Sequence, residues 1–222
     1  MLKKSCLVIV FNFILLALYS QVSEINLQDT SQWRVVNRSA TLIDEAGKKG
    51  ISFNEVPGNG LMIIKGLDFS NGAIELDIKG SNKPQQSFVG FAFHGQDVNI
   101  YDAVYFRPFN FKSQDEVRRS HSVQYISMPG NDWETLRNKF PGKYENKIAN
   151  PPAGDDWFHV KISVKGKQVL VFVNDEVNAS LQVEKLNDNM SGGVAIWMGN
   201  NSGGSFANLK ITNEDGGEID NR

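Results

Sequence analysis

The sequence predicts an all-β fold, an antiparallel β-sandwich of the jelly-roll type, and three observations support this. Short stretches alternate apolar and polar residues with the period of two that half-buried strands show. Glycine, proline, asparagine and aspartate separate these stretches at intervals of about eight to twelve residues, which is typical of sandwiches. Helical periodicity is confined to residues 132–139, where Asp132 is placed to cap a short helix. No internal repeat is visible, which argues against a propeller.

Composition narrows the classes of protein before any motif is considered. Apolar residues make up 41% of the 222 residues and charged residues 22%, which is ordinary for a folded globular chain. The formal net charge of -2 provides no basic surface. We therefore expect no nucleic-acid partner.

Residues 1–20 have the pattern of a secretory signal peptide. Lys3 and Lys4 precede an apolar run at residues 6–19, which is shorter than the roughly 20 residues that a helix needs to span a bilayer. We expect cleavage after Ser20, a single jelly-roll domain over residues 21–222, and a secreted or periplasmic location without stable membrane insertion. Cleavage would also remove the one cysteine of the chain, and with it any disulfide or thiolate chemistry.

The strand pattern is clearest at residues 73–79, where Ile74, Leu76 and Ile78 share one face and polar residues the other. Residues 158–164 repeat the pattern. Further strands are expected at residues 33–37, 60–65, 88–94, 101–109, 121–127, 168–173, 193–198 and 205–211.

Two connections between strands are also informative. Lys165-Gly166-Lys167 predicts a tight hairpin turn between two of the strands. Residues 127–156 form the longest stretch without strand character. Loops of that length in compact domains often carry function.

The strand at residues 88–94 alternates large and small side chains. Phe91 and Phe93 are expected in the core, whereas Gly90, Ala92 and His94 are expected on the opposite face. Small residues on that face leave room for a ligand to approach the backbone, or for a second sheet to pack closely. The sequence does not decide between these alternatives.

The strand at residues 101–109 places Tyr101, Tyr105 and Arg107 on one face. Aromatic rings stack on the apolar faces of sugars, and arginine donates a fixed fork of hydrogen bonds. These residues are therefore candidate saccharide contacts. The alternative is a surface ladder of tyrosines with the arginine packed over it.

Four further side chains complete the candidate binding face. Gln124 is expected to face the same cleft, because an amide offers both donors and an acceptor to sugar hydroxyls. Trp133 and Arg137 follow in the long connection and would form a wall, although an exposed loop tryptophan can also be a packing anchor. Trp197 precedes a glycine- and asparagine-rich turn and is expected at the rim.

Catalytic patterns are scarce. Retaining glycosidases need two carboxyl groups about 5.5 Å apart, and the nearest acidic pattern is Glu75 and Asp77, with Gly80 where a third acid would stand. We interpret these acids, and His159, as solvated side chains of an ordinary strand. The sequence leaves open whether calcium or another divalent metal binds. His94, His121 and Asp102 could converge on a metal, and the adjacent Asp155 and Asp156 could be calcium ligands or solvated acids, of which we favour the latter.

Residues 72–212 resemble the concanavalin A-like lectin/glucanase superfamily and, more narrowly, the 3-keto-disaccharide hydrolase domain family of secreted bacterial proteins. The resemblance is carried by SFVGFAF at residues 87–93, VQYI at 123–126, WFHVKI at 157–162, VFVN at 171–174, GGVAIW at 192–197 and FANLKI at 206–211. It implies a jelly roll and a glycoside ligand. Members often carry an acid where Ser122 stands and an arginine near Phe93 and His94.

Two functional hypotheses follow. The first, placed slightly ahead because of the aromatic and polar strand face and the missing pair of carboxylates, is a secreted saccharide-binding jelly roll without catalysis. The second is a glycoside-processing enzyme of the 3-keto type, a hydrolase or lyase in which His94 or His121 transfers a proton.

Overall fold

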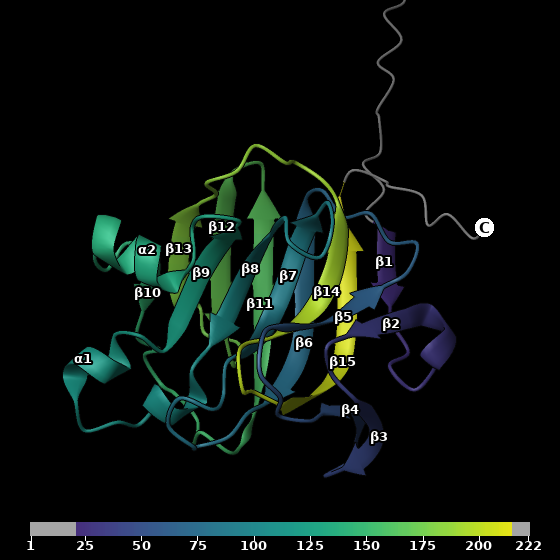
Figure 1. Cartoon of the computed structure of the whole chain (residues 1–222), viewed down its shortest axis with the longest axis horizontal. Helices are drawn as coiled ribbons and strands as arrows, with labels where there is room; N and C mark the ends of the chain where they lie inside the picture. Colours follow the sequence, from purple (N-terminus) through teal and green to yellow (C-terminus); the bar gives the residue numbers. More distant parts are fainter. Residues whose placement is uncertain (1–20, 215–222) are drawn as a thin grey trace, which may run out of the picture.

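The computed structural model describes residues 21–214, and most of its regular elements are strands (Figure 1). The expected signal peptide lies outside these residues. Between residues 21 and 214 we find no helix that is both long enough and apolar enough to cross a membrane.

The strands of this part of the chain form two sheets, here called sheet A and sheet B. Sheet A has the order β13 (Leu181–Glu184), β12 (Gln168–Val173), β11 (Trp157–Lys165), β6 (Gly72–Lys79), β15 (Gly204–Asn213), β4 (Lys48–Phe53) and β3 (Ala40–Glu45), with β1 (Gln21–Glu24) also paired to β15. Sheet B has the order β10 (Glu145–Asn146), β9 (Val123–Met128), β8 (Tyr101–Phe106), β7 (Val89–Gly95), β14 (Gly193–Met198), β5 (Gly60–Ile64) and β2 (Trp33–Val36). All of these neighbours pair antiparallel.

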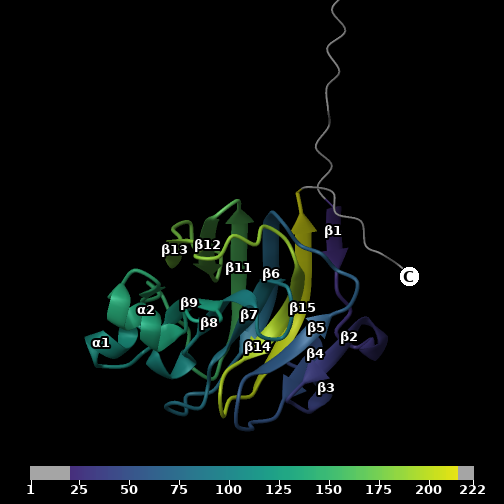
Figure 2. The same ribbon diagram turned by 45° about the horizontal axis from the view of Figure 1, so that its top comes forward.

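Four short helical elements lie in the connections. They are the 3₁₀ turns η1 (Thr30–Gln32) and η2 (Pro108–Asn110) and the helices α1 (Glu116–Arg119) and α2 (Trp133–Lys139). In Figure 1, α1 and α2 lie near β9 and β10 at one end of the sandwich, away from β2 and β3, and Figure 2 shows both helices on the side of β9 as well. Both of these α-helices therefore lie at the β10 edge of sheet B.

The two sheets pack face to face around one apolar core. Phe106 of sheet B and Phe158 of sheet A meet edge to face, with ring centroids 5.3 Å apart. Ile74, Leu76 and Ile78 are fully buried, as their alternation predicts. The fold is the predicted antiparallel sandwich.

All ten predicted strands are present, and the prediction of a helix capped by Asp132 is confirmed. Asp132 accepts a hydrogen bond from the Thr135 amide at 2.8 Å. The predicted strand at residues 101–109 ends at Phe106 instead, because Pro108 has no amide hydrogen and begins η2. The sequence did not predict β1, β3, β4, β10 and β13, which are short or rich in charged residues and show little alternation.

His94 departs from the face that alternation assigns to it. Its backbone φ of 51° interrupts the strand pattern, and its ring packs against the core residues Phe69 and Phe93. His94 Nε2 lies 2.8 Å from the Ser70 carbonyl oxygen, and Nδ1 accepts from the Lys185 ammonium at 2.6 Å. Burial lowers the pKa of His94, which keeps the imidazole neutral.

The same cluster contains a buried ion pair within the sandwich. Lys185 Nζ lies 3.0 Å from Asp102 Oδ2, and both side chains are completely buried. Tyr125 donates its hydroxyl to Asp102 Oδ1 at 2.5 Å. The lysine ammonium therefore stands next to both His94 and Asp102, two of the three predicted metal ligands, and His121 is not among its contacts.

Asp77 on sheet A is not the solvated acid that the sequence predicts. Its side chain is buried and accepts hydrogen bonds from Lys48 and Asn208, both at 2.6 Å. His159 Nδ1 lies 2.9 Å from Asp77 Oδ1, so His159 is a structural partner. Burial opposes ionisation of Asp77, but these hydrogen bonds prevail and lower its pKa to about 2, while the bond to Asp77 raises the pKa of His159.

We expect Asp77→Asn to lower the free energy of unfolding by about 2 kcal/mol at pH 5. The depressed pKa of Asp77 gives a contribution that is complete above its ordinary pKa of 3.8 and disappears as the pH falls toward 2. The contribution of His159, whose pKa is raised, is present below its ordinary pKa of 6.5. Urea unfolding at pH 5 and pH 2 measures the difference, with Glu75→Gln on the same strand as control. An equal loss at both pH values would contradict this account.

Candidate functional site

One row of side chains crosses sheet B on the face opposite the core. The strand register places Trp197 opposite Gly90, Gly90 opposite Tyr105, Tyr105 opposite Gln124, and Gln124 opposite Glu145. Residues directly opposite each other in an antiparallel sheet point to the same face. The row therefore joins four side chains and one glycine, one residue from each of five strands, and only Glu145 comes from a strand that the sequence did not predict.

Gly90 allows the aromatic side chains on either side of it in the row to come into contact. A Cβ atom at this position would lie 2.1 Å from the Val104 carbonyl oxygen and 2.7 Å from the Tyr105 Cβ. The rings of Tyr105 and Trp197 meet across the glycine, with centroids 4.8 Å apart. The space that the small residue leaves is thus filled by neighbouring aromatic rings.

Two adjoining cavities lie over this face and share Phe88, Trp133 and Asn200. The larger, here called the polar cavity, has a volume of about 530 Å³ and is lined by Pro84, Gln85, Phe88, Arg107, Phe109, Asn110, Arg118, His121, Trp133, Arg137 and Asn200. The smaller, here called the apolar cavity, has about 220 Å³ and is lined by Asn59, Phe88, Tyr105, Ile126, Met128, Asp132, Trp133, Trp197, Gly199 and Asn200. Together they form one groove.

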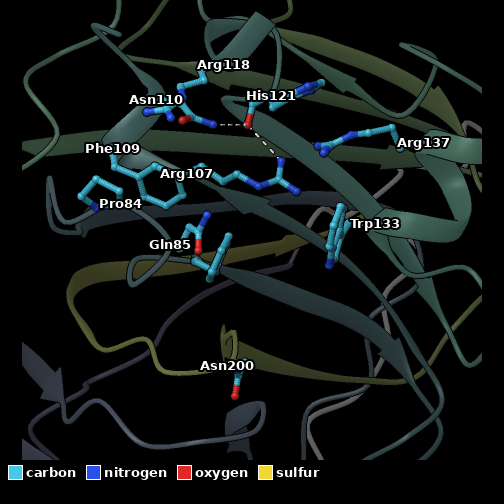
Figure 3. Close-up of a pocket in the computed structure, with 11 residues that line it drawn as sticks. Pro84, Gln85, Arg107, Phe109, Asn110, Arg118, His121, Trp133, Arg137 and Asn200 are labelled. Atoms are coloured by element: carbon cyan, nitrogen blue, oxygen red, sulfur yellow. Dashed lines mark hydrogen bonds between the residues drawn. The ribbon is translucent and has the colours of Figure 1, made fainter.

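Figure 3 shows how the polar cavity is built. Arg107 lies at its centre, Trp133 and Arg137 lie to one side, and Pro84, Gln85 and Phe109 lie to the other. Helix α2 presents Trp133 and Arg137 four residues apart on one face, and the Arg137 guanidinium lies 4.9 Å from the indole centroid.

A buried carboxylate holds the wall of the polar cavity. Glu145 accepts two hydrogen bonds from Arg137, at 2.8 Å from Nε and 2.6 Å from Nη2. Its Oε2 also lies 2.9 Å from His121 Nδ1 and 3.8 Å from Arg107 Nη1. This bidentate pair fixes α2 against β10, since both nitrogens must stay in the plane of the carboxylate.

Arg107 is anchored from three sides. It donates to the His121 carbonyl oxygen at 2.9 Å, to the Tyr105 hydroxyl at 2.6 Å and to Gln124 Oε1 at 3.3 Å. Gln124 in turn donates to the carbonyl oxygens of Tyr125 and Tyr144. Burial raises the pKa of Tyr105 to about 12, so its phenol stays neutral and accepts from the guanidinium.

Among the titratable side chains that line the groove, His121 has the pKa closest to neutral pH. Partial burial lowers its pKa below the ordinary 6.5, Glu145 opposes this shift, and Arg137 and Arg107 add to it. The imidazole is therefore neutral at pH 7. A neutral imidazole beside a carboxylate can accept a proton.

The predicted site residues fall into three groups. Arg107, His121, Trp133 and Arg137 line the polar cavity, and Tyr105, Trp133 and Trp197 line the apolar one. Tyr101 accepts a hydrogen bond from Trp197 Nε1 at 3.1 Å and lines neither cavity, and Gln124 is fully buried beneath Arg107. His94 is fully buried and lines neither cavity.

Several residues of the site escaped the sequence analysis. Glu145, which lies beneath the polar cavity, stands in a strand of two residues. The lining residues Phe88, Arg118 and Asn200 come from segments far apart in the chain. Asp115 caps α1 by accepting a hydrogen bond from the Val117 amide. This capping residue is the one local signal in the sequence that could have predicted the helix carrying Arg118. Across residues 21–214, no group of three or more histidine, cysteine, aspartate or glutamate side chains is arranged to hold a metal ion.

The architecture defines a jelly-roll domain of the type found in carbohydrate-binding modules and lectins. The carbohydrate-binding module CBM66 from Bacillus subtilis superposes with a TM-score of 0.59 at 13% identity over 81% of this chain and 95% of that one. The VIP36 exoplasmic/lumenal domain, in a Ca²⁺/Man3GlcNAc-bound form, gives 0.56 at 8% identity over 89% and 92%. A structure described as native glycosidic hydrolase gives 0.53 at 14% identity over 91% and 99%.

The chain belongs to the 3-keto-alpha-glucoside-1,2-lyase-like domain family, whose sequence profile matches residues 22–212. No curated protein matches it. The family resemblance seen in the sequence is thus confirmed.

We expect Glu145→Gln to lower the free energy of unfolding by about 3 kcal/mol, because the variant leaves Arg137 and Arg107 without their shared carboxylate. The pKa of His121 should fall further, since Glu145 is the group that raises it. Chemical denaturation and an NMR titration of the His121 ring measure the two effects. Glu134→Gln, an exposed acid on α2, is the control. An unchanged His121 titration would contradict the assigned contact.

Proposed function

We propose that this protein binds a saccharide in the groove formed by the polar and apolar cavities. The observation that carries the proposal is Trp133, whose indole is 44% exposed and lines both cavities. An exposed tryptophan between two cavities offers an apolar plane on which a sugar ring can stack.

The polar partners around Trp133 suit the same ligand. Arg137 and Asn110 offer donors, and Asn200 offers both a donor and an acceptor, at the edges of the groove. The rings of Phe88 and Phe109 meet at right angles with centroids 5.6 Å apart and form a further apolar wall. Ligand sites commonly combine apolar walls with a few fixed polar groups.

We further propose that the protein works outside the cytoplasm, as a secreted or periplasmic protein. The support is the signal-peptide pattern of residues 1–20, and family membership is compatible with a glycoside ligand met outside the cell.

Trp133→Ala should weaken saccharide binding by about tenfold or more without unfolding the protein. The residue is partly exposed, so its loss removes a stacking surface and little core. A glycan screen followed by calorimetry measures the effect. Phe140→Ala, an aromatic residue of similar exposure that lines neither cavity, is the matched control. Equal effects of both substitutions would place the binding site elsewhere.

The second candidate function is processing of 3-keto glycosides, and His121 favours it. A 3-keto group acidifies the C–H bond at C2, so a base can remove that proton while the electron pair expels the oxygen at C1. The oxygen leaves with the aglycone and takes up a proton. His121 Nδ1 lies 2.9 Å from Glu145 Oε2. With the carboxylate on that side of the ring, Nε2 is the nitrogen that would accept the C2 proton.

Incubation with plain oligosaccharides and their 3-keto derivatives, with and without chelator, tests this second function by mass spectrometry. An enzyme should release product from the 3-keto substrates, and His121→Gln should abolish it while His159→Gln should not. Because the pKa of His121 is lowered, activity should fall on the acid side only below pH 6.5. Thermal stabilisation by a glycan without product formation would leave the binding function alone.

A further inference from the structure

The polar cavity has an unusual balance of charge. Arg107, Arg118 and Arg137 line it, and no carboxylate does among the residues that the structure describes. The acid closest to them is Glu145, which lies beneath the surface with its side chain 4% exposed. The cavity therefore carries more positive than negative charge, although the whole chain has a net charge of -2.

Glu145 does not neutralise all three arginines. Both of its oxygens are bound by Arg137, and the nearest nitrogen of Arg107 is 3.8 Å away. Arg118 has an exposed partner, Asp115, at 3.9 Å, where water screens the attraction. With Glu145 and Asp115 counted against the three arginines, one formal positive charge is in excess at the cavity.

Arg107 is better shielded from water than Arg118. Its side chain is 6% exposed, and the hydrogen bonds it donates go to neutral oxygens of His121, Tyr105 and Gln124. Burial lowers its pKa, but a guanidinium stays protonated at neutral pH. Because the rings of Phe88 and Tyr105 flank it, little water screens its field toward the cavity.

The aromatic walls and the excess charge occupy the same cavity. Trp133, Phe88 and Phe109 provide apolar planes. Figure 3 shows Arg107 between Phe109 and Trp133, and Arg118 and Arg137 on either side of His121. A neutral sugar would use the planes and leave the charge uncompensated. An oxyanion would compensate it through the forked donors of arginine.

We propose that the saccharide bound here carries an anionic substituent, a carboxylate or a sulfate group, seated in the polar cavity at Arg107 and Arg118. The inference rests on the proposed saccharide-binding function and names its ligand class. Trp133 stacks on the sugar ring, and the apolar cavity receives the uncharged remainder of the ligand.

Calorimetry with matched ligands tests the proposal on the purified protein. One pair is oligogalacturonate and its methyl ester, and the other is a sulfated galactan fragment and its desulfated form. In at least one pair the charged member should bind about 10- to 100-fold more tightly, as expected for charge-assisted hydrogen bonds. This preference should shrink when NaCl is raised, and the pair that shows it identifies carboxylate or sulfate as the anion.

Matched variants separate a local site from net charge. Arg118→Gln should remove most of the preference for the charged ligand, since Arg118 is exposed and its loss spares the core. Arg34→Gln, an exposed arginine on β2 at the opposite edge of sheet B, removes the same charge and should change nothing.

Each outcome separates this inference from the proposed function. Equal affinity for charged and neutral members overturns the anionic ligand and leaves saccharide binding intact. Equal weakening by Arg118→Gln and Arg34→Gln also overturns it, because net charge alone would then explain the preference. Absence of binding to any member of either pair, and to every neutral glycan of the screen, would overturn the proposed function together with this inference.

Discussion

The bidentate ion pair between Glu145 and Arg137 is the contact on which the groove depends. It joins β10, at the edge of sheet B, to α2, which covers that edge. The carboxylate also lies 2.9 Å from His121 Nδ1, so the same residue fixes one wall and places a negative charge beside the imidazole. Removing one member of a buried ion pair leaves its partner's charge uncompensated, which is why the groove and the stability of this edge are linked.

Strand register places Glu145 on the same face of sheet B as the other residues of the row. The row from Trp197 through Gly90, Tyr105 and Gln124 to Glu145 brings strands that are distant in the sequence to one face. Position 90 has no room for a side chain, because a methyl group on Gly90 would collide with the backbone of β8. Tyr105 and Gln124 then hold Arg107 from below and direct its charge toward the groove.

The three histidines show how environment determines the role of one side-chain type. His94 is completely buried beside the Lys185 ammonium, and His159 is bound to the buried Asp77 on sheet A. Only His121 lines the groove. Burial lowers the pKa of His94 and His121, whereas the carboxylate of Asp77 raises that of His159, so His159 would titrate at a higher pH than the other two.

The sequence by itself determined the fold class, the main strands and the short helix, because a period of two and a helix cap are local signals. It also predicted Arg107, His121, Trp133 and Arg137 as site residues, and these four line the polar cavity. It could not identify Glu145, whose strand of two residues has no readable period, or Arg118 and Asn200, which approach the others only after folding. It also misplaced His94 and Asp77, because alternation predicts a face but neither a left-handed residue nor a lysine two strands away in the sheet. Tertiary structure alone decided which polar groups were buried and paired, since charge compensation depends on distances in space and not on spacing along the chain.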